Sequence, residues 1–178
     1  YSLPMAKQVG AKGAVYAFEP GTLAKKHLEM SKMENNFNHL EVVGRGLGEK
    51  AGEASFETAQ TPELNRITEQ GEEKIALTSL DAWWGFAGKP KVDFMKVDVN
   101  GMEADILAGG SWMFEETKPV IIAAIGEGEQ GFTSLQNQLK EYDYQLFEYI
   151  PGPGLLADFD SESGMDPYKM NVIAIPED

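Results

Sequence analysis

An acidic residue follows the first apolar run of the sequence, at a position where an acid can bind a nucleotide. Glu19 comes directly after the run 14–18. In nucleotide-binding α/β folds, an acid at the end of this strand accepts hydrogen bonds from ribose hydroxyls. The alternative interpretation is a carboxylate in a solvated loop.

A second polar group lies at the end of the run 92–98 and consists of Asp98, Asn100, Gly101 and Glu103. A carboxylate at the end of a central strand is suited to act as a general base or as a substrate anchor. The alternative is structural. Asp98 would cap a helix that opens at Gly101, and Glu103 would favour the positive end of the helix dipole.

Two features of the sequence resemble metal-binding patterns but do not match them. The segment 158–164 has the acidic spacing of a calcium loop, but its glycine is one place late. Lys169 also stands where a bidentate glutamate is expected. His27 and His39 have no second histidine or carboxylate at ligand spacing, so both are interpreted as structural.

The composition excludes several functional classes. The 178 residues include 29 acidic and 15 basic side chains, for a net charge of −14. A nucleic-acid binder needs a basic surface, and anionic membrane surfaces are disfavoured for the same reason. The absence of cysteine excludes disulfides and thiolate chemistry. No apolar run approaches the ~20 residues of a membrane-spanning helix. We expect a cytoplasmic protein.

The elements that must position these residues alternate along the chain. Apolar runs predict strands at 14–18, 40–43, 92–98, 119–125, 145–150 and 171–175, with edge strands at 55–57 and 74–76. Periodicity and start signals predict helices at 1–9, at 22–34, from Ser79 onward, just after Gly101, and at 134–142. This order predicts a Rossmann-like, doubly wound, mostly parallel α/β sheet in a single domain over residues 1–178.

Several local features follow from this fold. The carboxyl ends of the strands should bring together Glu19, 44–48, Asp98 and 126–129. The last two strands are joined only by a loop at 151–167, which predicts an antiparallel hairpin at the edge of the sheet.

Packing expectations are equally specific. Thr22 is expected to cap its helix, and Asn35 and Asn36 to end it. Between them, Leu23, His27, Met30 and either Met33 or Glu34 follow at helical spacing. Trp83, Trp84 and Trp112 are expected to be packing residues, because no basic surface accompanies them.

The co-linear motifs resemble one known family, the FkbM family of S-adenosylmethionine-dependent methyltransferases. They are Val-Tyr-Ala-Phe-Glu-Pro at 15–20, Leu-Thr-Ser-Leu-Asp at 77–81, Asp-Phe-Met-Lys-Val-Asp-Val-Asn-Gly-Met-Glu at 93–103, Ile-Leu-Ala-Gly at 106–109, and the runs 118–122 and 144–147. The resemblance implies a class I methyltransferase fold, whose seven-stranded sheet has one antiparallel strand. It also implies S-adenosylmethionine bound over the carboxyl ends of the strands.

The resemblance also implies roles for particular residues. Glu19 matches the ribose-binding acid, and Gly46 and Leu47 lie where the family's loop approaches the adenine. Asp98 and Glu103 match the acids that flank the family's Asp-Val-Glu-Gly segment. On this resemblance, we expect the first strand and its glycine loop to precede Tyr1, because Gly10 and Gly13 fit a helix end and a turn instead.

The chain departs from the family pattern at two positions. Asn100 stands where the family usually has Glu, and Ala124 replaces a Glu near the end of an apolar strand, with Glu127 and Glu129 just beyond. The leading hypothesis is methyl transfer to a hydroxyl oxygen of a sugar, a lipid-linked compound or another small metabolite. Asp98 would remove the proton or anchor the cofactor, with Glu103 in support.

Two alternatives stay open at this point. The two departures motivate a degenerate member that binds a ligand or a partner protein without turnover. A nicotinamide-dependent oxidoreductase shares the ribose-binding acid but not the other motifs. The expected partner is a small-molecule acceptor, and neither nucleic acid nor a membrane is expected. The sequence is also compatible with a homo-oligomer.

Overall fold

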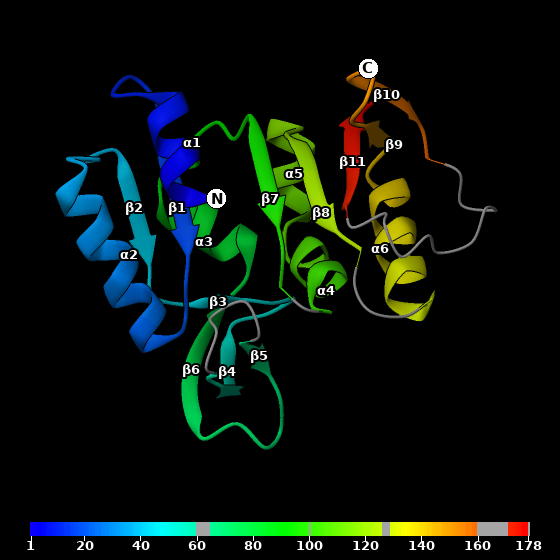
Figure 1. Ribbon diagram of the computed structural model, residues 1–178. Coiled ribbons are helices and arrows are strands. Elements are labelled where there is room, and N and C mark those ends of the chain that lie inside the picture. The colour runs from blue at the N-terminus through cyan, green and yellow to red at the C-terminus, as the bar shows by residue number, and fades with distance from the viewer. Residues whose placement is uncertain (60–64, 100, 126–128, 160–170, 178) are drawn as a thin grey trace. The chain divides into compact units, whose positions relative to one another are not determined.

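The computed structural model describes residues 1–59, 65–99, 101–125, 129–159 and 171–177 (Figure 1). The chain is mixed α/β and divides into two compact units. The first comprises Tyr1–Leu47 and Ala51–Thr78, and the second Gly48–Lys50 and Ser79–Asp178. Each unit has sheets of its own.

A parallel pair of strands forms the centre of the first unit. Its elements are α1 (Ser2–Val9), β1 (Val15–Phe18), α2 (Thr22–Glu34) and β2 (Leu40–Val43). β1 and β2 pair in parallel. Ala6, Ala17 and Leu40 form the buried core, where two alanines allow close packing of helix and strand. A ring nitrogen of His39 lies 2.7 Å from the Ala6 carbonyl oxygen, so His39 has a structural role here.

Helix α2 differs from the expectation in two ways. Its N-cap is Gly21, whereas Thr22 is its first residue and donates its hydroxyl proton to Glu73. Leu23 is 56% exposed and Met30 50% exposed, so the predicted apolar face is not the packed one. Leu28 contacts the core instead. The ends agree, because Asn35 is the C-cap.

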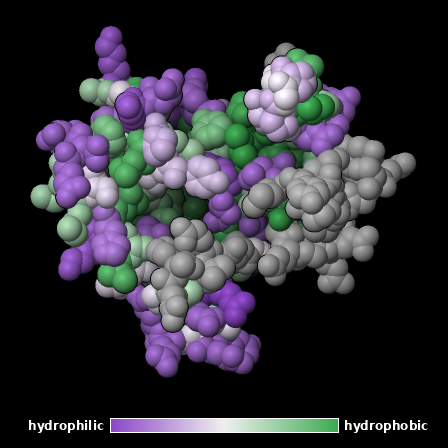
Figure 2. All heavy atoms as spheres, viewed as in Figure 1, coloured by the Kyte–Doolittle hydropathy of each residue, from purple (hydrophilic) through white to green (hydrophobic). Residues whose placement is uncertain are grey.

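A four-stranded sheet completes the first unit. In the order β3-β6-β4-β5 it consists of β3 (Gly46–Leu47), β6 (Glu73–Thr78), β4 (Gly52–Glu57) and β5 (Arg66–Ile67). The runs 55–57 and 74–76, expected at an edge, lie in the interior strands β4 and β6. The two-residue strands β3 and β5 form the edges. Figure 2 shows mainly hydrophilic residues over this sheet, at the bottom of the view.

The second unit contains a five-stranded sheet in the order β10-β9-β11-β8-β7. The strands are β7 (Phe94–Val97), β8 (Val120–Ala124), β9 (Tyr144–Ile150), β10 (Leu155–Asp158) and β11 (Asn171–Pro176). β7 and β8 are parallel, and β11 is antiparallel to both β8 and β9.

The predicted edge hairpin is therefore only half right. β9 and β11 are antiparallel as expected, but β11 inserts between β8 and β9 and is interior. The edge is formed by β10, in the segment expected to be a loop, where Leu155 pairs with Ile150. Among the described residues, the pairs β1–β2 and β3–β6 are parallel besides β7–β8. The mixed α/β class is confirmed, and the mostly parallel sheet only in part.

The described part of the second unit contains the helices α3 (Leu80–Phe86), α4 (Glu103–Ala108), α5 (Ser111–Thr117) and α6 (Glu129–Glu141). Leu135 and Leu139 of α6 are buried, as their spacing predicts. Tyr144 is buried and donates its hydroxyl proton to the Pro119 carbonyl at 2.9 Å. Burial raises the pKa of Tyr144, so it remains a donor.

The start of α3 was predicted correctly, since Ser79 Oγ accepts the Ala82 amide at 3.2 Å. Trp83 and Trp84 are buried as expected, but Trp112 is 66% exposed, so its predicted packing role is wrong. Within the described residues, no helix is both long and apolar enough to cross a membrane.

Candidate functional site

Glu19 stands at the carboxyl end of β1, where the sequence placed it. Its amide donates to the Val43 carbonyl at 3.0 Å, which continues the pairing with β2. Its carboxylate Oε1 accepts the Gly21 amide at 2.9 Å. Burial raises the pKa of Glu19, the Gly21 hydrogen bond opposes this, and the negative charge of Glu73 adds to it. The group is a half-buried acceptor on a defined turn.

Glu73 was not singled out from the sequence, yet it contacts the same turn. Its Oε1 accepts the Thr22 amide at 3.2 Å and the Thr22 hydroxyl at 2.5 Å. Its Oε2 accepts the Thr58 hydroxyl at 2.9 Å. These hydrogen bonds, with that of the Thr22 hydroxyl the strongest, hold the pKa of Glu73 below its ordinary value. No sequence signal pointed to Glu73, because it lies in a polar stretch far from Thr22.

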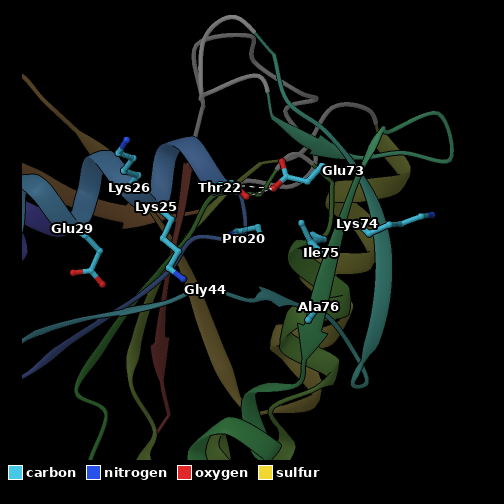
Figure 3. A pocket seen from close by; sticks show the side chains of 10 residues that line it. All are labelled: Pro20, Thr22, Lys25, Lys26, Glu29, Gly44, Glu73, Lys74, Ile75 and Ala76. Atoms are coloured by element: carbon cyan, nitrogen blue, oxygen red, sulfur yellow. Dashed lines mark hydrogen bonds between the residues drawn. The ribbon is translucent and has the colours of Figure 1, made fainter.

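A cavity of about 350 Å³ adjoins this turn in the first unit. The residues lining it are Pro20, Thr22, Lys25, Lys26, Glu29, Gly44, Glu73, Lys74, Ile75 and Ala76. In Figure 3 the Lys25 side chain runs toward Gly44, while Lys26 and Lys74 point elsewhere. A Cβ at Gly44 would displace the end of the Lys25 side chain, so the glycine leaves room for the ammonium at this place.

Gly46 and Leu47, predicted to approach an adenine, form strand β3 instead of an open loop. They pair in parallel with Leu77 and Thr78 of β6. Gly46 is buried, and a Cβ there would lie 2.7 Å from Leu77 Cδ2. The glycine therefore has a packing reason of its own, and its role toward a ligand stays a prediction.

Asp98 follows β7 in the second unit and pairs with a lysine of that strand. Lys96 Nζ lies 3.2 Å from Asp98 Oδ2, and the Lys96 side chain is only 7% exposed against 42% for Asp98. Lys96 also donates to the Val97 carbonyl at 3.0 Å. Asp98 stands two residues after Lys96, the spacing at which side chains of an extended chain share a face. The carboxylate of Asp98 is thus held by a buried cation and remains open to solvent.

The helix-capping alternative for Asp98 is wrong. α4 begins at Glu103, after the expected Gly101, and its N-cap is Met102 with no side-chain hydrogen bond. Glu103 is 3% exposed and accepts the amides of Val99 at 3.3 Å and Gly101 at 2.9 Å. Its carboxylate accepts two amides of the loop that follows Asp98, and its catalytic role stays a prediction.

Other sequence predictions lie partly outside the described residues. Asn100, Glu127 and most of 158–164 are among these, and the expected gathering of Glu19 with Asp98 joins two separate units and stays a prediction. Ala124 is half-buried at the end of β8. No group of three or more His, Asp or Glu side chains able to hold a metal ion occurs in the part of the chain that the structure describes.

Comparison with known proteins bears on the whole chain. A sequence model of the methyltransferase FkbM domain matches residues 1–146. The crystal structure of methyltransferase FkbM from Methylobacillus flagellatus KT has a similar fold, with a TM-score of 0.64 and 17% sequence identity. The match covers 97% of this chain, which spans 40% of that protein's length. A search of curated proteins finds no match.

Proposed function

Because the chain belongs to the FkbM methyltransferase domain family, we propose that it binds S-adenosylmethionine and methylates a hydroxyl oxygen. The acceptor would be a sugar or another small metabolite. The observation that carries the proposal is Glu19, an acceptor held on the turn after β1 beside a cavity. An acid there suits the two hydroxyls of a ribose.

The residues of the first unit fit the nucleoside part of this cofactor. In the described part of the chain, Glu19 Oε1 accepts one amide while Oε2 accepts no hydrogen bond, which leaves acceptor capacity for ligand hydroxyls. The adjacent cavity has apolar side chains from Pro20, Ile75 and Ala76, which suit a flat base. When bound, S-adenosylmethionine supplies an activated methyl group on a sulfonium centre.

Asp98 is proposed to take the proton of the acceptor hydroxyl. The acceptor oxygen would form a bond to the methyl group that S-adenosylmethionine supplies as the carbon–sulfur bond breaks, and the hydroxyl proton would pass to the Asp98 carboxylate. Lys96 keeps this carboxylate in one position, and Glu103 shapes the backbone that follows it. Alignment of the attacking oxygen then contributes most of the acceleration.

Binding of S-adenosylmethionine tests the proposal first. Isothermal calorimetry with S-adenosylhomocysteine is expected to give binding to the unaltered protein. Glu19→Ala should weaken it by about 10-fold or more, because a hydrogen bond to a charged group contributes about 1.5–3 kcal/mol. The matched control is Glu41→Ala, an exposed acid of β2. Equal affinities for all three proteins would exclude the ribose role.

Methyl transfer tests the second half of the proposal. With a panel of hydroxylated sugars and labelled S-adenosylmethionine, Asp98→Asn is expected to lower turnover by about 10²–10⁴-fold, the range of a general base. Its affinity for S-adenosylhomocysteine should stay unchanged. Full turnover in this variant would remove Asp98 from the chemistry.

A further inference from the structure

The turn between β1 and α2 is held by two carboxylates on consecutive amides. The Gly21 amide donates to Glu19 Oε1 at 2.9 Å, and the Thr22 amide donates to Glu73 Oε1 at 3.2 Å. Figure 3 shows the Glu73 carboxylate directed at Thr22. The Gly21 amide of this turn holds Glu19 Oε1, so a shift of the turn would change the direction of the Glu19 carboxylate.

Glu73 supplies what the helix lacks at its start. The first amides of a helix have no partner within it, and the N-cap Gly21 has no side chain to accept them. Glu73 fills this position from strand β6, 51 residues away in sequence. Its negative charge also lies at the positive end of the helix dipole.

Glu73 also forms a hydrogen bond outside helix α2. Its Oε2 accepts the Thr58 hydroxyl at 2.9 Å, and Thr58 follows directly after β4. One carboxylate thus joins the first residue of α2 to two interior strands of the four-stranded sheet. Thr22 and Glu73 of this network also line the cavity next to Pro20.

We propose that Glu73 is a positioning residue for ribose recognition: it fixes the turn 20–22 so that Glu19 presents its second oxygen to the ligand hydroxyls. The inference rests on the proposed function, because it needs Glu19 to bind ribose. It goes beyond that function by assigning a role to Glu73 of strand β6, a residue outside the family motifs found in the sequence.

The test measures recognition of the ribose hydroxyls separately from overall stability. Calorimetry compares S-adenosylhomocysteine with its analogue lacking both ribose hydroxyls. The unaltered protein is expected to bind S-adenosylhomocysteine about 10-fold or more tightly than the analogue, and tenfold corresponds to about 1.4 kcal/mol. Glu19→Ala is expected to lose this preference. Glu73→Ala should lower the preference at least threefold, and Glu73→Gln, which keeps one acceptor oxygen, less.

The control is Glu72→Ala, which removes the same charge from an exposed neighbour and should keep the full preference. Thr22→Val removes one hydrogen bond and no charge, and it should lower the preference for the ligand with ribose hydroxyls about twofold. This variant provides the test if Glu73→Ala fails to fold. An unchanged preference in both the Glu73 and Thr22 variants overturns the positioning role while Glu19 and the proposed function stand. An unaltered protein without any preference overturns the ribose role of Glu19 itself.

Discussion

Substitution of Glu103 tests most directly how the loop after Asp98 is held in place. The carboxylate is 3% exposed and accepts the amides of Val99 at 3.3 Å and Gly101 at 2.9 Å. Hydrogen bonds to charged groups contribute about 1.5–3 kcal/mol each. The Val99 bond is long and Gly101 is exposed, so water replaces part of the loss. We expect Glu103→Ala to lower the free energy of unfolding by about 2–4 kcal/mol.

Equilibrium unfolding in urea, followed by tryptophan fluorescence, measures this change. Asp105→Ala is the matched control, because Asp105 is an exposed acid in the first turn of the same helix. Its unfolding free energy should change by less than about 0.5 kcal/mol, as for most surface substitutions. In a domain of this size, each kcal/mol moves the thermal midpoint by about 2–4 °C. A Glu103→Ala protein as stable as the control would refute the argument that this carboxylate organises the loop.

Three further outcomes are expected. Burial raises the pKa of Glu19 in the folded protein, so at pH values above the ordinary pKa of a glutamate its ionisation opposes folding. Urea titrations should therefore show Glu19→Gln to be more stable than the parent at pH 7, and this difference should vanish at pH 4. Asp81→Ala removes the acceptor of two amides at the start of α5 and should cost about 1–2 kcal/mol in thermal unfolding, whereas the exposed Glu115→Ala should not. Gly46→Ala should cost about 1–3 kcal/mol through overpacking, whereas Gly52→Ala, whose Cβ meets nothing within 4 Å, should not.

Local pattern was enough to find most elements. The run 40–43 coincides with β2, and Ser79 begins α3 through its own side-chain oxygen. Both features depend on residues adjacent in sequence, namely an apolar run that must be buried and a hydroxyl within reach of its own helix. The acid after β1 was found for the same reason, because its position relative to the strand end is a sequence property.

Strand order was less accessible. β11 lies between β8 and β9, and β10 pairs at the edge although its segment has the glycine and proline of a loop. Pairing partners are set by which apolar faces cover one another across the sheet, and that choice is not written in any one strand. α2 shows the same limit: helical spacing of Leu23 and Met30 predicted a packed face, yet Leu28 on another face meets the core.

The site divides along the same line. The sequence by itself determined the mixed α/β class, the family motifs, and the presence of acids at the ends of β1 and β7. The tertiary structure decided what those acids contact. Glu73 reaches Thr22 across 51 residues, and the Glu103 carboxylate accepts the amides of Val99 and Gly101. Hydrogen bonds between distant segments depend on how the backbone brings their atoms within about 3 Å, which residue spacing does not encode.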